Sequence, residues 1–436
     1  MTKTALPVSQ NERADILDVL RGFALFGVML DNLFGFTGWG FFTQPMREAL
    51  PTWPADGLLG LLEIAFVHGK FYSLFSMLFG IGFSIILIRN EQKGINPFKV
   101  FYRRLIILML FGAAHLFLFW EGDILFLYAL VGLCLPLFRK CSDRALLIWA
   151  IALIASPLLI DVLKVLTGIK TGAVIENMAI ATDAKNGIVG DDFRSYLFKE
   201  GSGWQEWRNW QASGFLYRYS YIIESNRIPK VLGLFLIGFW AGRKMIYAHL
   251  ENYIPLFRKL RKWGFIIGIP ASLAMAYFEI DQKEIPDAFG LLDTFFYALG
   301  VVPLSLAYAS TICLHWTKKR KKIPGNSPPY VAEKVKSKLR FLAPVGRMAL
   351  TNYLMQTFIG IAIYYGVGLG FGGKIGPSVF IPAALCVYAL QIAYSNLWFK
   401  YFNYGPFEWI WRQLTYGRRL PLLKLQAKPV EAPMTV

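Results

Sequence analysis

The sequence predicts an all-α, polytopic membrane protein, and two observations support this fold class. Hydrophobic residues make up 55% of the 436 residues and charged residues only 17%, whereas an ordinary soluble domain is about 45 to 50% apolar. The mean hydropathy is +0.43. Long apolar runs also recur along the chain, for example in residues 71–88, 105–119 and 231–241. With their flanks these runs approach the roughly 20 residues that a helix needs to cross a bilayer.

Counting the apolar runs gives about ten predicted transmembrane helices in a single bundle. They lie near residues 16–36, 58–88, 102–120, 124–138, 145–166, 229–248, 263–279, 291–315, 345–369 and 376–399. An even number of spans places both ends of the chain on the same side of the membrane.

The orientation follows from the lysines and arginines of the short loops. Residues 89–104, 139–144, 243–262 and 318–347 are rich in these residues, whereas 121–123 and 279–287 are mainly acidic. The positive-inside rule therefore predicts that both ends are cytoplasmic. We expect positions 122 and 200 outside, and positions 95, 325 and 425 inside. The net charge of +18 suits cytoplasmic flanks that face anionic membrane lipid, so no nucleic-acid partner is expected.

Five segments follow from this pattern. They are an N-terminal five-span bundle with a polar cluster (1–166), an extracytoplasmic loop or lid (167–228), spans six to eight (229–317), a basic cytoplasmic linker (318–344), and a C-terminal two-span segment with an interfacial helix (345–436). Within the loop, Trp204, Trp207 and Trp210 share one helical face. This face either rests among the outer headgroups or stacks on a sugar or lipid substrate.

The remaining composition argues against a processed leader and against a metal centre. Residues 1–15 are polar and no cleavage site follows the first apolar run, so the first span is predicted to remain as an anchor. The four cysteines (Cys134, Cys141, Cys313 and Cys386) contain no C-x-x-C pair. We therefore expect packing residues rather than disulfides or metal ligands.

Ionisable residues gather near the outer ends of the first three spans. Asp31 lies 13 residues after Asp18 in span one, which is about 20 Å along a helix. His68 and Lys70 begin the descent of span two, and Gly69 between them is expected to interrupt the helix or to let a backbone carbonyl face a cavity. His115 lies near the outer end of span three. Charges at membrane depth face the bundle interior or water and usually mark a functional site. We expect Asp31, His115 and Asp123 to line one cavity, with two of them within about 8 Å.

The chemistry of this outer cluster depends on His115. A histidine held by a carboxylate is the usual general base for activating a hydroxyl, whereas a lone histidine on a helix is often a hydrogen-bonded packing residue. The candidate catalytic residues are His115, Asp123 and Asp31. The candidate substrate-binding residues are Asn32, His68, Lys70, Trp120, Asn352 and Gln356. Asp31, Asn352 and Gln356 serve equally well as inter-helix hydrogen-bonding groups.

A second group of charged residues is expected at the cytoplasmic side. Asp18 and Arg21 are spaced i, i+3, and Glu408 and Arg412 are spaced i, i+4, which suits ion pairs on one helical face. Gly22 lets another helix approach. Arg347 marks the cytoplasmic start of span nine. The expected cytoplasmic-side residues are therefore Asp18, Arg21, Arg347, Glu408 and Arg412.

Five stretches resemble the YeiB-like family of bacterial inner-membrane proteins, whose activity is not settled. They are residues 17–22, 69–80, 115–125, 346–356 and 405–412. The resemblance implies a multi-pass protein of the bacterial cytoplasmic (inner) membrane, and His115 and Asp123 belong to the family pattern. The opening Asp-x-x-Arg-Gly motif is similar to that of membrane acyltransferases of the heparan glucosaminide acetyltransferase type. That likeness implies acyl-CoA as a donor and a glycan or lipid acceptor. Those enzymes use a histidine in the loop after the first spans, and residues 37–67 contain none.

Three functions are compatible with these residues. The first is an acyltransferase that passes an acyl group to an extracytoplasmic acceptor, with His115 as base and Asp123 or Asp31 as its partner. The second is a proton-coupled transporter or flippase in which Asp31, Lys70 and His115 carry a proton or bind an anion. The third is a non-catalytic envelope component. The absence of a G-x-x-x-x-G-K-[ST] loop argues against ATP-driven transport. The oligomeric state is left open.

Overall fold

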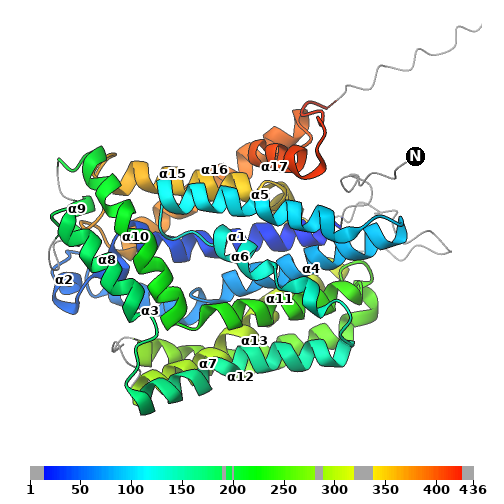
Figure 1. Cartoon of the computed structure of the whole chain (residues 1–436), viewed down its shortest axis with the longest axis horizontal. Helices are drawn as coiled ribbons and strands as arrows, with labels where there is room; N and C mark the ends of the chain where they lie inside the picture. Colours follow the sequence, from blue (N-terminus) through cyan, green and yellow to red (C-terminus); the bar gives the residue numbers. More distant parts are fainter. Residues whose placement is uncertain (1–13, 189–192, 199–200, 280–287, 319–336, 425–436) are drawn as a thin grey trace, which may run out of the picture.

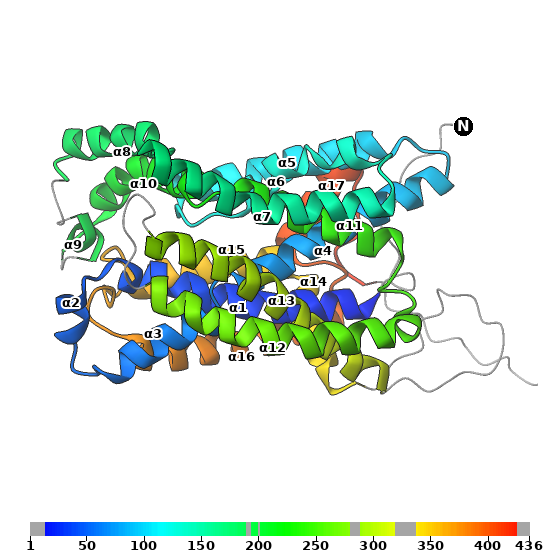
Figure 2. The ribbon, with the colours of Figure 1, turned by 90° about the horizontal axis from the view of Figure 1, so that it is seen from below.

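The computed structural model describes residues 14–188, 193–198, 201–279, 288–318 and 337–424. Within these ranges the regular elements are helices, apart from one isolated bridge between Phe402 and Leu423. The long helices run along a common axis, so that the molecule is an elongated bundle (Figure 1, Figure 2). The predicted all-α fold class is confirmed.

The first part of the chain alternates long helices with short turns. Its helices are α1 (Asp15–Phe36), η2 (Trp39–Phe41), α2 (Gln44–Glu48), α3 (Ala55–Phe66), α4 (Lys70–Gln92), α5 (Pro97–Leu118), α6 (Leu125–Gly132), η3 (Leu135–Phe138) and α7 (Asp143–Thr167). The chain breaks between α3 and α4 at Gly69, whose φ of 80° suits glycine. This interruption was expected from the sequence.

Three helices form an insert between α7 and the second part of the bundle. They are α8 (Ala173–Lys185), α9 (Phe193–Phe198) and α10 (Trp204–Glu224). The insert lies at the end of the bundle opposite α17 (Figure 1, Figure 2). In α10, Trp207 and Trp210 are buried whereas Trp204 is exposed. The expected common face therefore packs mainly inward.

The second part returns along the bundle in further helices. They are α11 (Arg227–Arg243), η5 (Leu250–Tyr253), α12 (Ile254–Glu279), α13 (Ala288–Lys318), η6 (Lys338–Leu342), α14 (Ala343–Arg347), α15 (Ala349–Tyr364), α16 (Pro377–Tyr401) and α17 (Pro406–Tyr416). Most of the predicted basic linker (318–344) lies outside the described residues.

Among the described residues, six helical stretches are long and apolar enough to cross a membrane. They are Asp15–Phe36, Ala55–Gln92, Pro97–Leu118, Asp143–Thr167, Gly290–Lys318 and Pro377–Tyr401. The predicted span at 124–138 forms two short helices, and α11 and α15 have only 17 and 16 residues. The chain is a membrane protein by these helices, while the number of ten spans and their orientation stay predictions.

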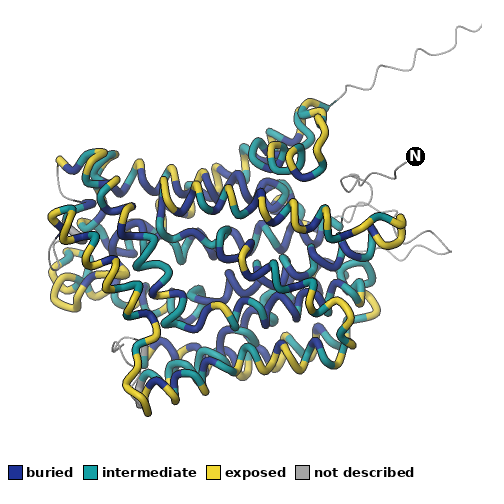
Figure 3. The backbone as a smooth tube through the Cα atoms, viewed as in Figure 1, coloured by how far each residue is buried: buried dark blue, intermediate teal, exposed yellow. Residues whose placement is uncertain are grey.

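Close helix contacts at glycines hold the interior together. Gly80 of α4 lies against the carbonyl of Phe235, and Gly238 of α11 lies against the carbonyl of Met77, with no room for a Cβ at either glycine. The expected close approach at Gly22 is confirmed, because the backbones of α1 and α14 meet there. Large apolar side chains nevertheless remain exposed, and Figure 3 shows exposed positions along the outer helices of the bundle. Such a surface suits lipid rather than water.

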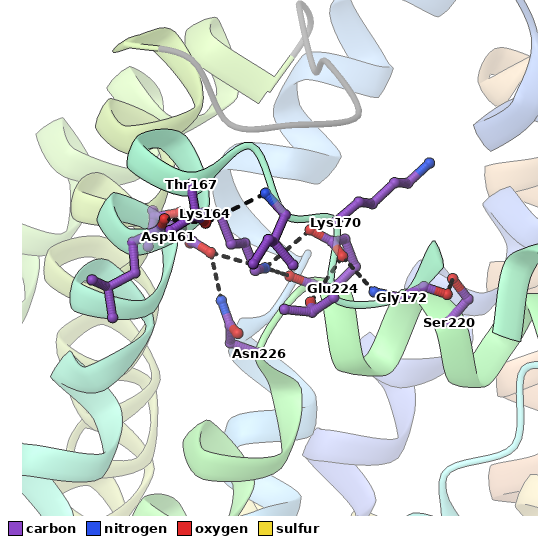
Figure 4. Close-up of polar contacts among 12 residues, drawn as sticks. Asp161, Lys164, Thr167, Lys170, Gly172, Ser220, Glu224 and Asn226 are labelled. Atoms are coloured by element: carbon purple, nitrogen blue, oxygen red, sulfur yellow. Dashed lines mark hydrogen bonds and ion pairs between the residues drawn. The ribbon is translucent and has the colours of Figure 1, made fainter. Parts of the chain in front are cut away.

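Buried polar contacts fasten the insert to the bundle (Figure 4). Lys164 of α7, only 2% exposed, lies 3.1 Å from both Asp161 and Glu224 and donates to the Glu224 carbonyl. Asn226 donates to Asp161 at 2.6 Å. Burial would raise the pKa of Glu224, but hydrogen bonds, with that from the Gly172 N–H foremost, hold this pKa below its ordinary value. Both ends of the insert are thereby tied to α7.

The predicted orientation can be tested at two exposed lysines at opposite ends of the bundle. In a background without the four native cysteines, Lys185→Cys in α8 is expected to react with an impermeant maleimide on intact cells. Lys93→Cys, after α4, is expected to react only after the cells are opened, because basic loops remain in the cytoplasm. Labelling of Lys93→Cys on intact cells would overturn the assignment.

Candidate functional site

The strongest polar contact predicted from the sequence joins His115 and Asp123. His115 lies in the last turn of α5, and Asp123 lies in the turn that leads into α6. The His115 Nδ1 atom is 2.8 Å from Asp123 Oδ2, and Asp123 Oδ1 accepts the backbone N–H of Phe126 at 2.7 Å. The turn is tight because Gly112 of α5 lies against the backbone of Phe126. The expected proximity of two members of the cluster is confirmed.

The other ring nitrogen of His115 meets a residue that the sequence analysis missed. His115 Nε2 is 2.9 Å from the hydroxyl oxygen of Thr357 in α15. With the carboxylate of Asp123 as acceptor, Nδ1 carries the proton and Nε2 is left to accept from the hydroxyl. The contacts therefore run carboxylate, imidazole, hydroxyl, the order found in activated nucleophile sites. Thr357 directly follows the predicted residue Gln356, but nothing in the sequence indicated that α15 packs against His115.

Aromatic rings enclose this triad of Asp123, His115 and Thr357. The ring of Tyr353 lies 5.2 Å from the His115 ring, and Trp120 lies 6.2 Å away. Trp120, a predicted substrate-binding residue, stacks on Phe36. His115 and Asp123 are only 1% and 2% exposed. Water is excluded from the triad, which strengthens its electrostatic interactions.

A second polar group forms where α1 meets the break between α3 and α4. Asp31 Oδ1 lies 2.8 Å from His68 Nδ1. The carboxylate that contacts His115 is therefore that of Asp123 and not that of Asp31. Glu63 of α3 joins this group, and its carboxylate, that of Asp31 and the His68 ring lie within 4.8 Å of one another. These are groups that divalent metals accept, although we predicted no metal ligands. Arg227 lies within electrostatic range of Asp31 and adds a positive charge.

The other predicted substrate-binding residues make structural contacts. Lys70 is fully buried and donates to the carbonyl of Ile64 at 2.7 Å, which holds the break between α3 and α4. Asn32 is half-buried beside Asp31. Asn352 and Gln356 bind Ser395 and Gln391 of α16 at 3.2 and 2.8 Å. These amides join α15 to α16, as the alternative interpretation proposed.

The predicted cytoplasmic-side residues lie together at the opposite end. Arg21 binds the buried Asp18 at 2.5 Å. Glu408 of α17 accepts the backbone N–H groups of Leu350 and Thr351 and the Thr351 hydroxyl. Burial raises the pKa of Glu408 above its ordinary value. These contacts of Glu408 fasten α17 to α15. The predicted ion pair between Glu408 and Arg412 stays a prediction.

Two of the three arginines predicted at this end lie on aromatic rings. The guanidinium of Arg347 is 3.9 Å from the centre of the Phe399 ring, and that of Arg412 is 5.2 Å from the centre of the Tyr404 ring. Both arginines line a cavity of about 330 Å³. The lining also contains Asp18, Arg21 and Glu408, so this end of the bundle is hollow.

The cavity that Asp31, His115 and Asp123 are expected to share stays a prediction. None of the three lines the 330 Å³ cavity. His115 and Asp123 satisfy each other beneath packed rings, and Asp31 is taken up by His68. Tyr353 connects the cavity to His115, because it lines the cavity and its ring packs against the His115 ring.

The comparisons with known proteins identify the family. The family described as "Protein of unknown function (DUF418)" matches residues 241–418. "Uncharacterized protein YxaH" of Bacillus subtilis (strain 168) is 32% identical to the chain, over 96% of the chain and 98% of that protein. The chain belongs to the DUF418 family. "Uncharacterized protein YeiB" of Escherichia coli (strain K12) is 28% identical, over 93% of the chain and 96% of that protein. No solved structure matches this chain.

The match to YeiB confirms the resemblance to the YeiB-like family that the sequence motifs indicated. The segment matched by the family, 241–418, contains Tyr353, Thr357 and Glu408. His115 and Asp123 lie before that segment, but within the region aligned with the full-length relatives. The triad is therefore assembled from both parts of the chain.

Proposed function

We propose that this DUF418 protein is a membrane acyltransferase that moves an acyl group to an extracytoplasmic glycan or lipid acceptor. The observation that carries the proposal is the buried contact chain from Asp123 through His115 to the hydroxyl of Thr357. A histidine with one nitrogen held by a carboxylate and the other on a hydroxyl is arranged for proton removal from an oxygen. Packing alone does not call for that order of groups.

In the proposed reaction the acceptor hydroxyl takes the place of the Thr357 hydroxyl at His115 Nε2. The acceptor oxygen attacks the acyl carbonyl while His115 removes its proton. The new ester bond forms, the bond from the acyl carbon to the carrier breaks, and the proton passes from His115 to the departing carrier. Asp123 keeps the imidazole in the required tautomer and stabilises its positive charge.

The donor in this proposal is a cytoplasmic acyl carrier, with acyl-CoA as the candidate. The acceptor approaches from the side of the insert. Arg218 of α10 supports that placement, because it lies within electrostatic range of both Asp123 and Tyr353. The group formed by Asp31, Glu63 and His68 offers polar contacts for an acceptor, and the proposed location is the bacterial inner membrane.

The test is a mass-spectrometric comparison of envelope lipids and glycans from cells with and without the full chain. We expect at least one envelope component to carry an acyl group only when the protein is present. Identical envelopes, together with protein-dependent uptake or release of a solute, would overturn acyl transfer. That result would favour the proton-coupled transporter or flippase.

A further inference from the structure

The cavity at the cytoplasmic end has a strongly basic mouth. Four arginines line it, namely Arg21, Arg104, Arg347 and Arg412, against two carboxylates, Asp18 and Glu408. Asp18 is bound by Arg21, and Glu408 already accepts three hydrogen bonds. The mouth therefore keeps a positive excess. Guanidinium groups at this density suit a phosphate-bearing partner, since their planar donors match phosphate oxygens.

Beyond the mouth the cavity becomes an apolar bore between α1, α4 and α5. Its walls are the side chains of Leu25, Val28, Leu78, Phe79, Phe83 and Leu105. On α1 the lining runs from Asp18 to Val28, which is about 15 Å at the rise of an α-helix. A bore with these apolar walls disfavours polar groups and accepts one long, narrow chain of the ligand.

One position in the wall is open. A Cβ added at Gly82 of α4 would meet no atom within 4 Å, whereas most glycines inside this bundle are held against a neighbouring backbone or ring. Gly82 lines the cavity. The absence of a side chain here keeps the bore wide.

We propose that this cavity binds a phosphate-bearing acyl compound, with its phosphates on the mouth arginines and its acyl-bearing arm in the bore. The shared chemistry fits two sources, an acyl-CoA from the cytoplasm and a single-chain phospholipid from the inner leaflet. Tyr353 brings the inner part of the bore to His115. The inference deepens the proposed acyl transfer, on which it rests for its role, by placing the donor.

The decisive experiment measures binding to the purified full chain in nanodiscs of zwitterionic lipid, by calorimetric titration. The probes are palmitoyl-CoA, palmitoyl lysophosphatidate and, as the matched phosphate-free control, monopalmitoylglycerol. We expect at least one phosphate-headed probe to bind, and to bind about tenfold or more tightly than monopalmitoylglycerol, because charge-assisted hydrogen bonds to phosphate are lost when the head has no phosphate. The probe that binds tells which source supplies the ligand.

Gly82→Phe adds a ring at a position where a Cβ would meet no atom within 4 Å, and it replaces a helical glycine, so folding is expected to be kept. It should weaken the binding of the phosphate-headed probe about tenfold or more, since the ring occupies the place of the arm. Ala152→Phe adds the same bulk at an exposed site on α7 and should leave binding unchanged. The double variant Arg347→Gln and Arg412→Gln should weaken binding and flatten its dependence on salt.

Equal binding by Gly82→Phe and the unchanged protein would overturn the proposal, as would equal affinity for monopalmitoylglycerol. The assay needs no turnover. Binding without any envelope acylation would therefore contradict the proposed function while keeping this site, and acylation that survives Gly82→Phe would contradict the site alone.

Discussion

His115→Gln is expected to abolish acyl transfer while leaving expression and the melting temperature in detergent nearly unchanged. Glutamine keeps one hydrogen bond but cannot take up a proton near neutral pH. General-base catalysis contributes roughly 100- to 10,000-fold, so the acylated envelope component should fall below detection. The measurement is the same mass-spectrometric comparison, on cells with matched amounts of each protein.

Asp123→Asn is the matched companion variant. An amide still orients the His115 ring but does not stabilise its positive charge, so activity should fall less than in His115→Gln and in the same direction. Thr357→Val should keep most activity, because in the proposed reaction its hydroxyl only holds the place of the acceptor. A His115→Gln protein that melts several degrees lower yet keeps full activity would show that the triad serves packing alone.

Lys164→Met is expected to cause the largest loss of stability in the bundle. The variant leaves Asp161 and Glu224 without their central cation, and breaking a buried charge pair costs about 3 to 5 kcal/mol. The free energy of unfolding in detergent, measured by reversible denaturation, should fall by that amount. The insert should also become accessible to protease.

Lys170→Met provides the control for this effect. Lys170 pairs with Glu176 at 2.8 Å at the start of the same insert, but both side chains keep contact with solvent. Such exposed pairs contribute about 0 to 1 kcal/mol, so stability should hardly change. Equal losses in the two lysine variants would contradict a special role for the buried network.

The fold class followed from local features of the sequence, because a long apolar run specifies a helix wherever it lies. The interruption at Gly69 and the close contact at Gly22 were likewise local, as each depends on a residue without a side chain. The number of spans was less secure. Residues 124–138 are apolar enough to suggest one span. The turn at residues 133–134 and Pro136 divide them into α6 and η3.

The candidate site was predicted only where its partners are near in sequence. His115 and Asp123 are eight positions apart across a single turn, so their contact could be inferred. Thr357 lies 242 positions from His115, and no periodicity in either helix indicates that α15 packs there. The sequence likewise did not show which histidine Asp31 contacts, since the path of the chain between α1 and α4 places it against His68.

The cavity lined by Arg21, Arg104, Arg347 and Arg412 shows the same limit of sequence analysis. Three of its arginines were predicted at the cytoplasmic side, Arg21 and Arg412 in helical ion pairs and Arg347 at the start of span nine, whereas Arg104 was predicted only as a loop charge. Only the packing of α17 beneath α5, where Arg104 lies 3.9 Å from the centre of the Trp411 ring, gathers them around one opening. Charges from which the sequence predicts only the orientation of the chain therefore line one cavity when the helices pack together.

The buried contacts of Lys164 also bear on how the protein is made. When α7 leaves the ribosome, Asp161 and Lys164 are already present, but Glu224 lies 60 positions later and Asn226 65 positions after Asp161. At about 5 to 20 residues per second in synthesis, α7 waits several seconds with two charges near the edge of the bilayer. We therefore expect α7 to stay beside the insertion machinery until the insert has crossed and its end has returned to close the joint.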